Sequence, residues 1–145
     1  YEQFDKQIET NLKGAYFLSQ KFLRMYEKKH RNGGSILFLS SERGHYADDL
    51  PYGLIKAAIN SLTQGLAKML IHSNIRINAI APGITTTDMT GITKDDIYAD
   101  DYSTGRYYLP EEVAEVACFL VSDASSCLSG QIIICNNGDS INYRK

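Results

Sequence analysis

Residues 35–83 read SILFLSSERGHYADDLPYGLIKAAINSLTQGLAKMLIHSNIRINAIAPG and decide the fold. The short apolar run at 35–39 is typical of a strand covered on both faces in a parallel sheet. A polar loop follows, and a proline suited to a first helical turn then opens a predicted helix from 51 to about 72. Residues 75–81 form a second predicted strand, which Pro82-Gly83 ends. Strand, crossover helix and strand in this order predict a parallel pair with a right-handed connection.

The same alternation continues on both sides of this stretch. One amphipathic helix is predicted over residues 2–29, with apolar side chains spaced by three and four at Phe4, Ile8, Leu12, Ala15, Leu18, Phe22 and Met25. Residues 110–112 (PEE) open another helix, and residues 131–135 form a last strand. We therefore predict an α/β fold of three parallel strands with flanking helices.

The domain organisation follows from size and from the edges of this sheet. A chain of 145 residues, 43% hydrophobic, has the usual size of one domain. A domain that began at residue 1 would leave one edge of a two-sided apolar sheet unpaired, which is an aggregation hazard. We therefore expect residues 1–145 to be a single, incomplete domain that starts in mid-domain.

Composition and charge exclude several classes of function. Lys and Arg total 15 against 17 Asp and Glu, so there is no electrostatic reason to expect a nucleic-acid partner. No apolar run reaches membrane-spanning length, and the first ten residues are too polar for a signal peptide. The three cysteines, Cys118, Cys127 and Cys135, form no CxxC pair, which predicts reduced core thiols of a cytoplasmic protein. We predict no metal site.

Tyr52 and Lys56 are the first candidates for chemistry. They lie four residues apart and so share one face near the start of a helix. A cation there favours the phenolate form of tyrosine, as an acid/base acting on an alcohol or ketone requires. The spacing alone favours a plainer interpretation, an exposed Tyr and Lys on a helix.

Two loops at the same sheet edge strengthen the chemical interpretation. Residues 40–44 (SSERG) leave the first strand at its carboxyl end, where open α/β sheets place their ligand crevice. A hydroxyl there can hold a substrate oxygen near the phenol. Residues 82–89 (PGITTTDM) leave the second strand at that edge. Ordinary turn chemistry is the alternative for both loops.

These motifs together resemble a known family. SSERG, YGLIK, IRINAIAPGITTTDM and GRYYLPEEVAEVACFLVSDASSCLSGQ, in this order, are similar to the classical short-chain dehydrogenase/reductase family, and NLKG at 11–14 resembles its preceding helix motif. The resemblance covers nearly the whole chain. It implies the C-terminal half of a Rossmann-type, doubly wound parallel sheet. It also implies an NAD(P)-dependent oxidoreductase that interconverts a hydroxyl and a carbonyl on a small substrate, in a homodimer or homotetramer.

The resemblance also implies roles for single residues. Ser41 would orient the substrate, with Ser40 as the less favoured neighbour. Tyr52 would be the general acid in reduction and the base in oxidation. Lys56 would assist Tyr52 and bind the nicotinamide ribose. Asn11 would hold a water that continues the proton relay.

The implied cofactor is NAD or NADP. Its nicotinamide side would be lined by Pro82, Gly83, Thr85 and Thr87, together with Tyr52 and Lys56. The family's glycine-rich turn, which binds the pyrophosphate, and its selector of NAD against NADP belong to the half that is absent, so the sequence does not indicate which is used.

Four departures from the family pattern bear on substrate class more than on reaction type. Ile55 stands where a small residue is usual, and the loop from Ser41 to Tyr52 is about two residues shorter than usual. Thr85 replaces an aliphatic residue, and residues 135–138 (CNNG) differ from the family's closing motif.

The predicted substrate loop is the polar stretch at about 84–109. Its aspartates (Asp95, Asp96, Asp100 and Asp101) and its tyrosines suit a polyol or sugar-like substrate, because such groups bind hydroxyls well. A solvated mobile lid is the alternative for this loop. For the whole chain, the alternative is a non-catalytic fragment or binding module derived from a reductase.

Overall fold

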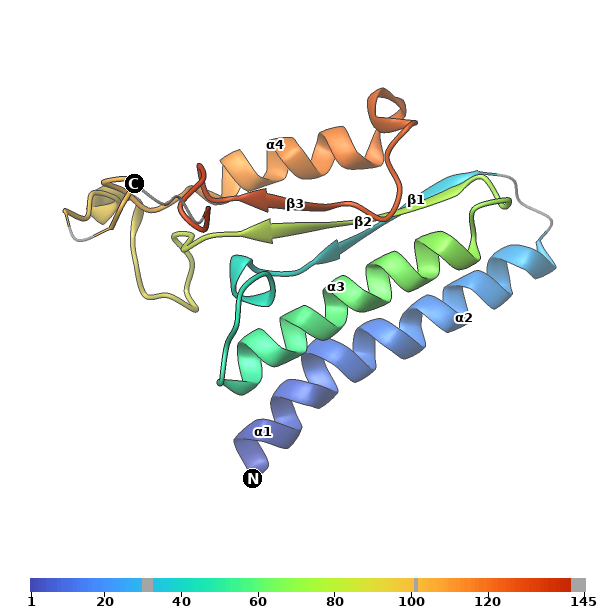
Figure 1. Cartoon of the computed structure of the whole chain (residues 1–145), viewed down its shortest axis with the longest axis horizontal. Coiled ribbons are helices and arrows are strands. Elements are labelled where there is room, and N and C mark those ends of the chain that lie inside the picture. The colour runs from blue at the N-terminus through green and yellow to red at the C-terminus, as the bar shows by residue number, and fades with distance from the viewer. Residues whose placement is uncertain (30–32, 101, 142–145) are drawn as a thin grey trace.

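A three-stranded parallel sheet lies between helices on its two faces (Figure 1). The computed structural model describes residues 1–29, 33–100 and 102–141. The strands, in the spatial order β1-β2-β3, are β1 (Gly34–Leu39), β2 (Ile75–Pro82) and β3 (Ile132–Cys135). The predicted α/β fold with three parallel strands is confirmed.

The strand register places the carboxyl ends of the three strands side by side. β1 pairs with β2 from Gly34↔Ile75 to Leu39↔Ile80, and β2 pairs with β3 up to Pro82↔Cys135. Because all pairings are parallel, the carboxyl ends of the strands meet at one edge of the sheet. Open α/β sheets bind their ligands at this edge.

Helices cover both faces of the sheet (Figure 1). On one face α3 (Pro51–Met69) lies beside a long N-terminal rod, and α4 (Pro110–Val121) covers the other face. The rod consists of α1 (Glu2–Gln7), a π-helical segment η1 (Ile8–Lys13) and α2 (Gly14–Lys28). Side chains of β2 alternate between the two layers, so that Ile77 and Ala79 join the α2/α3 core while Ile80 joins the α4 core.

The predicted apolar stripe of the first helix is wrong at Phe4, which is exposed near the end of the rod, and over its second half. Leu18, Phe22 and Met25 are exposed, and α2 instead buries a stripe that includes Leu23 and Tyr26. The physical reason is the π-helical segment, because its wider turn rotates every later residue relative to regular helical periodicity.

The connections contain short 3₁₀ turns: η2 (Glu42–Gly44), η3 (Lys94–Asp96) and η4 (Asp123–Ser125).

Arg76, a charged residue in a mostly buried strand, has a structural role. Its guanidinium donates to the carbonyls of Leu120 and Ser122, each at 2.9 Å, and so caps the end of α4.

All three cysteines are free, but their predicted place in the core is wrong for two of them. Cys118 and Cys127 are exposed, and Cys135 is half-buried. Cys118 lies on the outer side of α4, and Cys127 lies in the turn after η4, where the sheet does not cover them.

Candidate active site

The turn that leaves β1 is held tightly against α3. Ser40 donates its hydroxyl to Asn60 Oδ1 at 2.6 Å, and Asn60 Nδ2 donates to the carbonyl of Gly44 at 2.9 Å. A Cβ on Gly44 would lie 2.6 Å from the carbonyl carbon of Lys56. Only glycine therefore allows residues 40–44 to pack beside Lys56.

Lys56 and Tyr52 are brought together at this junction. The Lys56 Nζ lies 5.4 Å from the centroid of the Tyr52 ring and donates to the carbonyl of Leu39 at 2.9 Å. Lys56 is buried, and this burial lowers the pKa of its amine. An ammonium has three donors, so two remain for a ligand at the edge of the sheet.

The two adjacent serines differ in what their hydroxyls can do. Both are buried. Ser40 already donates to Asn60, whereas the Ser41 Oγ accepts the backbone N–H of Arg43 at 3.3 Å. Among the described residues the Ser41 hydroxyl proton has no acceptor, which leaves it available to a substrate oxygen. This difference favours Ser41 over Ser40 as the candidate.

A bidentate ion pair spans the short loop between Ser41 and Tyr52. Arg43 donates to the two carboxylate oxygens of Asp48 at 2.6 and 2.8 Å, and Asp48 also accepts the N–H of Leu50 at 2.9 Å. The guanidinium holds the pKa of Asp48 below its usual value. The pair ties the turn carrying Ser41 to the start of α3. Sequence reasoning missed it, although opposite charges five residues apart in a loop are a detectable signal.

Asn11 lies within the π-helical segment, which packs against α3. Its side chain is half-buried and donates to the carbonyl of Gln7 at 3.3 Å, inside its own helix. Its role in a proton relay stays a prediction. The irregular helix at this residue is a feature that often accompanies functional sites.

The residues predicted for the nicotinamide gather where β2 ends. Pro82 and Gly83 are half-buried, and the Thr85 hydroxyl donates to the carbonyl of Gly83 at 3.0 Å. Thr87 is exposed, and its N–H donates to Thr90 Oγ1 at 3.1 Å. The four residues therefore lie together at the carboxyl end of β2, and their contact with a nicotinamide stays a prediction.

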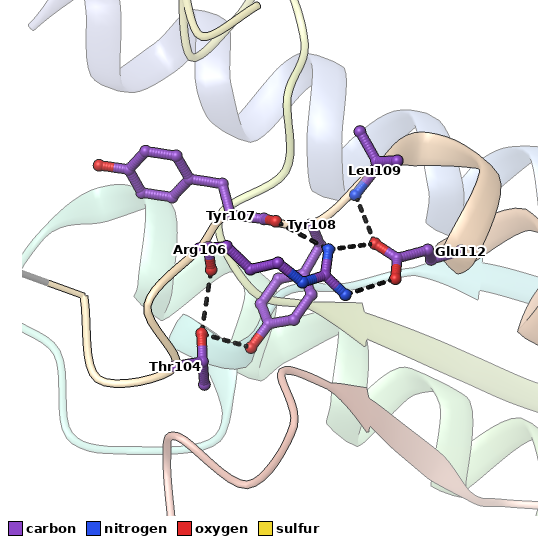
Figure 2. Close-up of polar contacts among 6 residues, drawn as sticks. All are labelled: Thr104, Arg106, Tyr107, Tyr108, Leu109 and Glu112. Atoms are coloured by element: carbon purple, nitrogen blue, oxygen red, sulfur yellow. Dashed lines mark hydrogen bonds and ion pairs between the residues drawn. The ribbon is translucent and has the colours of Figure 1, made fainter. Parts of the chain in front are cut away.

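The predicted substrate loop is anchored at its end by Arg106 (Figure 2). Its guanidinium donates twice to Glu112, at 2.9 and 2.6 Å, and once to the carbonyl of Tyr107 at 3.2 Å. Glu112 also accepts the N–H of Leu109 at 2.8 Å, which caps the first turn of α4. The hydrogen bond from Arg106 lowers the pKa of Glu112 to about 2.

The role of the loop aspartates in binding a substrate stays a prediction, as does the alternative of a solvated mobile lid. Asp95, Asp96 and Asp100 are exposed, and Asp101 lies outside the described residues.

Nothing in the sequence indicated two buried polar residues near this loop, Glu42 and Asn136. Glu42 accepts a hydrogen bond from Asn136 Nδ2 at 2.8 Å, and the two lie far apart along the chain.

The described residues contain neither a cluster of metal-ligating side chains nor a membrane-spanning helix. Within residues 1–29, 33–100 and 102–141, no three His, Cys, Asp or Glu side chains come together to hold a metal ion. No helix in the same part of the chain has the length and apolar character needed to cross a membrane.

The proteins that this chain resembles in sequence are named as reductases and dehydrogenases. A family model described as enoyl-(acyl carrier protein) reductase matches residues 1–140. The chain is 39% identical over 142 residues to a 3-oxoacyl-[acyl-carrier-protein] reductase of Thermotoga maritima, covering 94% of this chain and 57% of that protein. It is 37% identical over 146 residues to an NAD-dependent glycerol dehydrogenase of Listeria innocua, covering 97% and 57%.

Solved structures agree with these relatives. A short chain dehydrogenase from Leptospira borgpetersenii with bound NAD⁺ superposes with a TM-score of 0.83 at 29% identity, covering 97% of this chain and 57% of that one. A 3-ketoacyl-(acyl-carrier-protein) reductase from Brucella melitensis complexed with NADH gives 0.81 at 28%, covering 97% and 59%. The chain thus spans little more than half the length of its relatives.

Fold and sheet edge together define a Rossmann-type α/β protein, because three parallel strands with helices on both faces deliver their loops to one ligand-binding edge. The family model covers almost the whole chain, and the solved relatives share this architecture. The chain belongs to the short-chain dehydrogenase/reductase family.

Proposed function

We propose that this protein is an NAD(P)-dependent oxidoreductase that interconverts a hydroxyl and a carbonyl group on a small substrate. One observation carries the proposal. The buried amine of Lys56 lies 5.4 Å from the Tyr52 ring centroid, at the sheet edge where the Ser41 hydroxyl also lies. The chain spans little more than half of its relatives, so the proposal for the whole protein rests on the residues of this half.

The residues would divide the proton chemistry among them. Ser41 donates its hydroxyl to the substrate oxygen and holds it near Tyr52. Tyr52 gives a proton to that oxygen in reduction and takes it in oxidation. The positive charge of Lys56 favours the phenolate that remains after donation. Asn11 is proposed to hold a water that returns the proton from solvent.

The cofactor proposed for this chain is NAD or NADP. When bound, it supplies or accepts the hydride. Lys56 would use its two remaining donors on the ribose, while Pro82, Gly83, Thr85 and Thr87 line the nicotinamide side. Support comes from solved relatives with NAD⁺, NADH or NADP bound. Either dinucleotide is compatible with these residues.

Substitution of the phenol tests this function. Tyr52→Phe keeps the ring beside Lys56 and removes only the hydroxyl, so we expect dinucleotide binding to persist while turnover falls by about 100-fold or more. Tyr1→Phe is the matched control because Tyr1 is fully exposed and lies outside the proposed site. Dinucleotide oxidation or reduction is followed by absorbance, and binding is followed by fluorescence titration.

Undiminished turnover in Tyr52→Phe would contradict the assignment of Tyr52. The alternative, a non-catalytic binding module derived from a reductase, makes a different prediction in the same assays. The unsubstituted protein would then bind a dinucleotide or a ketone and turn over neither.

We also propose a homodimer or homotetramer that acts in the cytoplasm. Exposed aromatic side chains on α2, including Tyr16, Phe17 and Phe22, give this helix an apolar outer face. Three free thiols favour a reducing compartment. Sedimentation at micromolar concentration tests the assembly, and a monomer would count against it.

A further inference from the structure

Glu42 is a buried carboxylate whose bonding is incomplete. Its side chain accepts one hydrogen bond, from Asn136 Nδ2 at 2.8 Å, although an ionised carboxylate offers about four acceptor positions. The neighbouring cation, Arg43, is committed to both oxygens of Asp48, and no other cation of the described residues forms an ion pair with Glu42. Burial raises the pKa of Glu42. A group in this condition needs a further donor.

Tyr102, from the predicted substrate loop, has a hydroxyl that lacks an acceptor for its proton. Its hydroxyl is buried and has no hydrogen-bond partner of normal geometry in the described part of the chain; the nearby Ile84 backbone tends to lower its pKa, an effect smaller than that of burial. Packing against Tyr107 and Tyr108, with ring centroids 5.4 and 6.3 Å away, holds the ring in place. Burial and the nearby charge of Glu42 raise the pKa of Tyr102, so the phenol keeps its proton and can donate it.

Tyr102 lies beside Gly83, and so does Asn136, the hydrogen-bond partner of Glu42. A Cβ on Gly83 would be 3.1 Å from the Tyr102 hydroxyl and 3.0 Å from the Asn136 Cβ. Gly83 is proposed to line the nicotinamide side, and Glu42 directly follows Ser41 in the chain. Each unsatisfied group is therefore a neighbour of a residue that the proposed function assigns to the substrate or the cofactor.

The chemistry of the two groups selects a ligand. A carboxylate only accepts hydrogen bonds, whereas a protonated phenol can donate one. A hydroxyl can serve both at once, because it donates through its proton and accepts through its oxygen. A methyl group can serve neither.

We propose that Glu42 and Tyr102 bind a second hydroxyl of the substrate, next to the oxygen that Ser41 holds, with Asn136 as the positioning residue for Glu42. The substrate class is then an α-hydroxy ketone and the vicinal diol to which it is reduced. This inference rests on the proposed oxidoreductase function and specifies its substrate.

Kinetics with a matched pair of ketones test the site. The probes are 1,3-dihydroxyacetone and acetone, which share the reacting carbonyl and differ in the neighbouring hydroxyls. Glu42→Gln and Tyr102→Phe should each raise the KM for dihydroxyacetone by about 10-fold and leave the KM for acetone unchanged. Glu115→Gln and Tyr1→Phe, at exposed positions outside the predicted substrate loop, are matched controls that should change neither value.

Stability separates ligand binding from a structural role. Glu42→Gln keeps an oxygen that can accept from Asn136, and Tyr102→Phe removes a hydroxyl that has no partner to lose. A hydroxyl of this kind can be removed at no cost in folding stability. Weaker use of dihydroxyacetone in a fully stable Tyr102→Phe protein supports the site. An equal KM change for both ketones, or none, overturns it and leaves a water as the partner of the two groups.

A binding measurement keeps this result separate from the proposed function. On titration with dihydroxyacetone, and not with acetone, the NMR signals of the Asn136 side-chain amide should shift, and the shift should be lost in Tyr102→Phe. If the unsubstituted protein reduces neither ketone but the signals shift, the oxidoreductase function fails and the site stands. If it reduces both ketones and the signals do not shift, the site fails and the function stands.

Discussion

Two glycines of α3 should respond in opposite ways to the same substitution. At Gly53 a Cβ would lie 2.6 Å from the Asp48 Cβ and still closer to its carboxylate, whereas at Gly65 a Cβ meets no atom within 4 Å. Gly53→Ala must therefore displace Asp48 from Arg43 and from the Leu50 N–H. Gly65→Ala displaces nothing.

The magnitudes follow from two opposing effects. Overpacking of this kind costs about 1–3 kcal/mol, and replacing glycine by alanine in a helix gains at most about 1 kcal/mol. We expect Gly53→Ala to lower the free energy of unfolding by about 1–2 kcal/mol and Gly65→Ala to raise it by up to about 1 kcal/mol.

Urea unfolding followed by circular dichroism measures both variants. The double variant Asp48→Ala/Gly53→Ala should lose less stability than the sum of its single substitutions, because the clash is absent once the carboxylate is removed. Turnover of Gly53→Ala should also fall, since the loop between Ser41 and Tyr52 loses its ion pair. Equal stabilisation by both Gly→Ala substitutions would refute the contact between Asp48 and α3.

Two predictions concern the dependence of stability on pH. Glu112→Gln should lower the free energy of unfolding at pH 7 by less than about 1 kcal/mol, because both partners of its ion pair are well exposed, and the deficit should fade as pH falls from 4.5 toward about 2. Glu115→Gln is its control, and an unchanged deficit at pH 2 would contradict the role of the ion pair. The raised pKa of Glu42 works in the opposite sense, since the folded state binds its proton more tightly than the unfolded state. Glu42→Gln should therefore be more stable than the unsubstituted protein at neutral pH, and this gain in stability should disappear below pH 4.5. Thermal unfolding at a series of pH values measures it. A gain in stability that persists at pH 3 would argue that the burial of a charged carboxylate is not its cause.

Local patterns were sufficient to predict most of the fold. The apolar run at 35–39 and the proline at 51 led to β1 and the start of α3, because strand burial and helix initiation depend on neighbouring residues. The first helix failed where periodicity was extrapolated across residues 8–13. The π-helical turn there packs against α3, and no pattern within a single helix contains this tertiary contact.

The types of residue in the candidate site could be predicted from the sequence. Several of the contacts around them could not. Tyr52 and Lys56 are close in sequence, so their proximity could be anticipated. The contact between Glu42 and Asn136 joins residues 94 positions apart, and it exists only because β1 and β3 end at the same edge. Tyr102 depends in the same way on how the loop folds back over Gly83. Such pairings follow from topology and not from local pattern.

The pH dependence of alcohol oxidation in Lys56→Met tests the central claim most directly. If the buried amine favours the phenolate of Tyr52, its loss should move the acidic limb of the rate profile, measured at saturating dinucleotide, to higher pH by about one unit or more. A profile that keeps its limb while only the affinity for dinucleotide falls would contradict the proposed proton transfer.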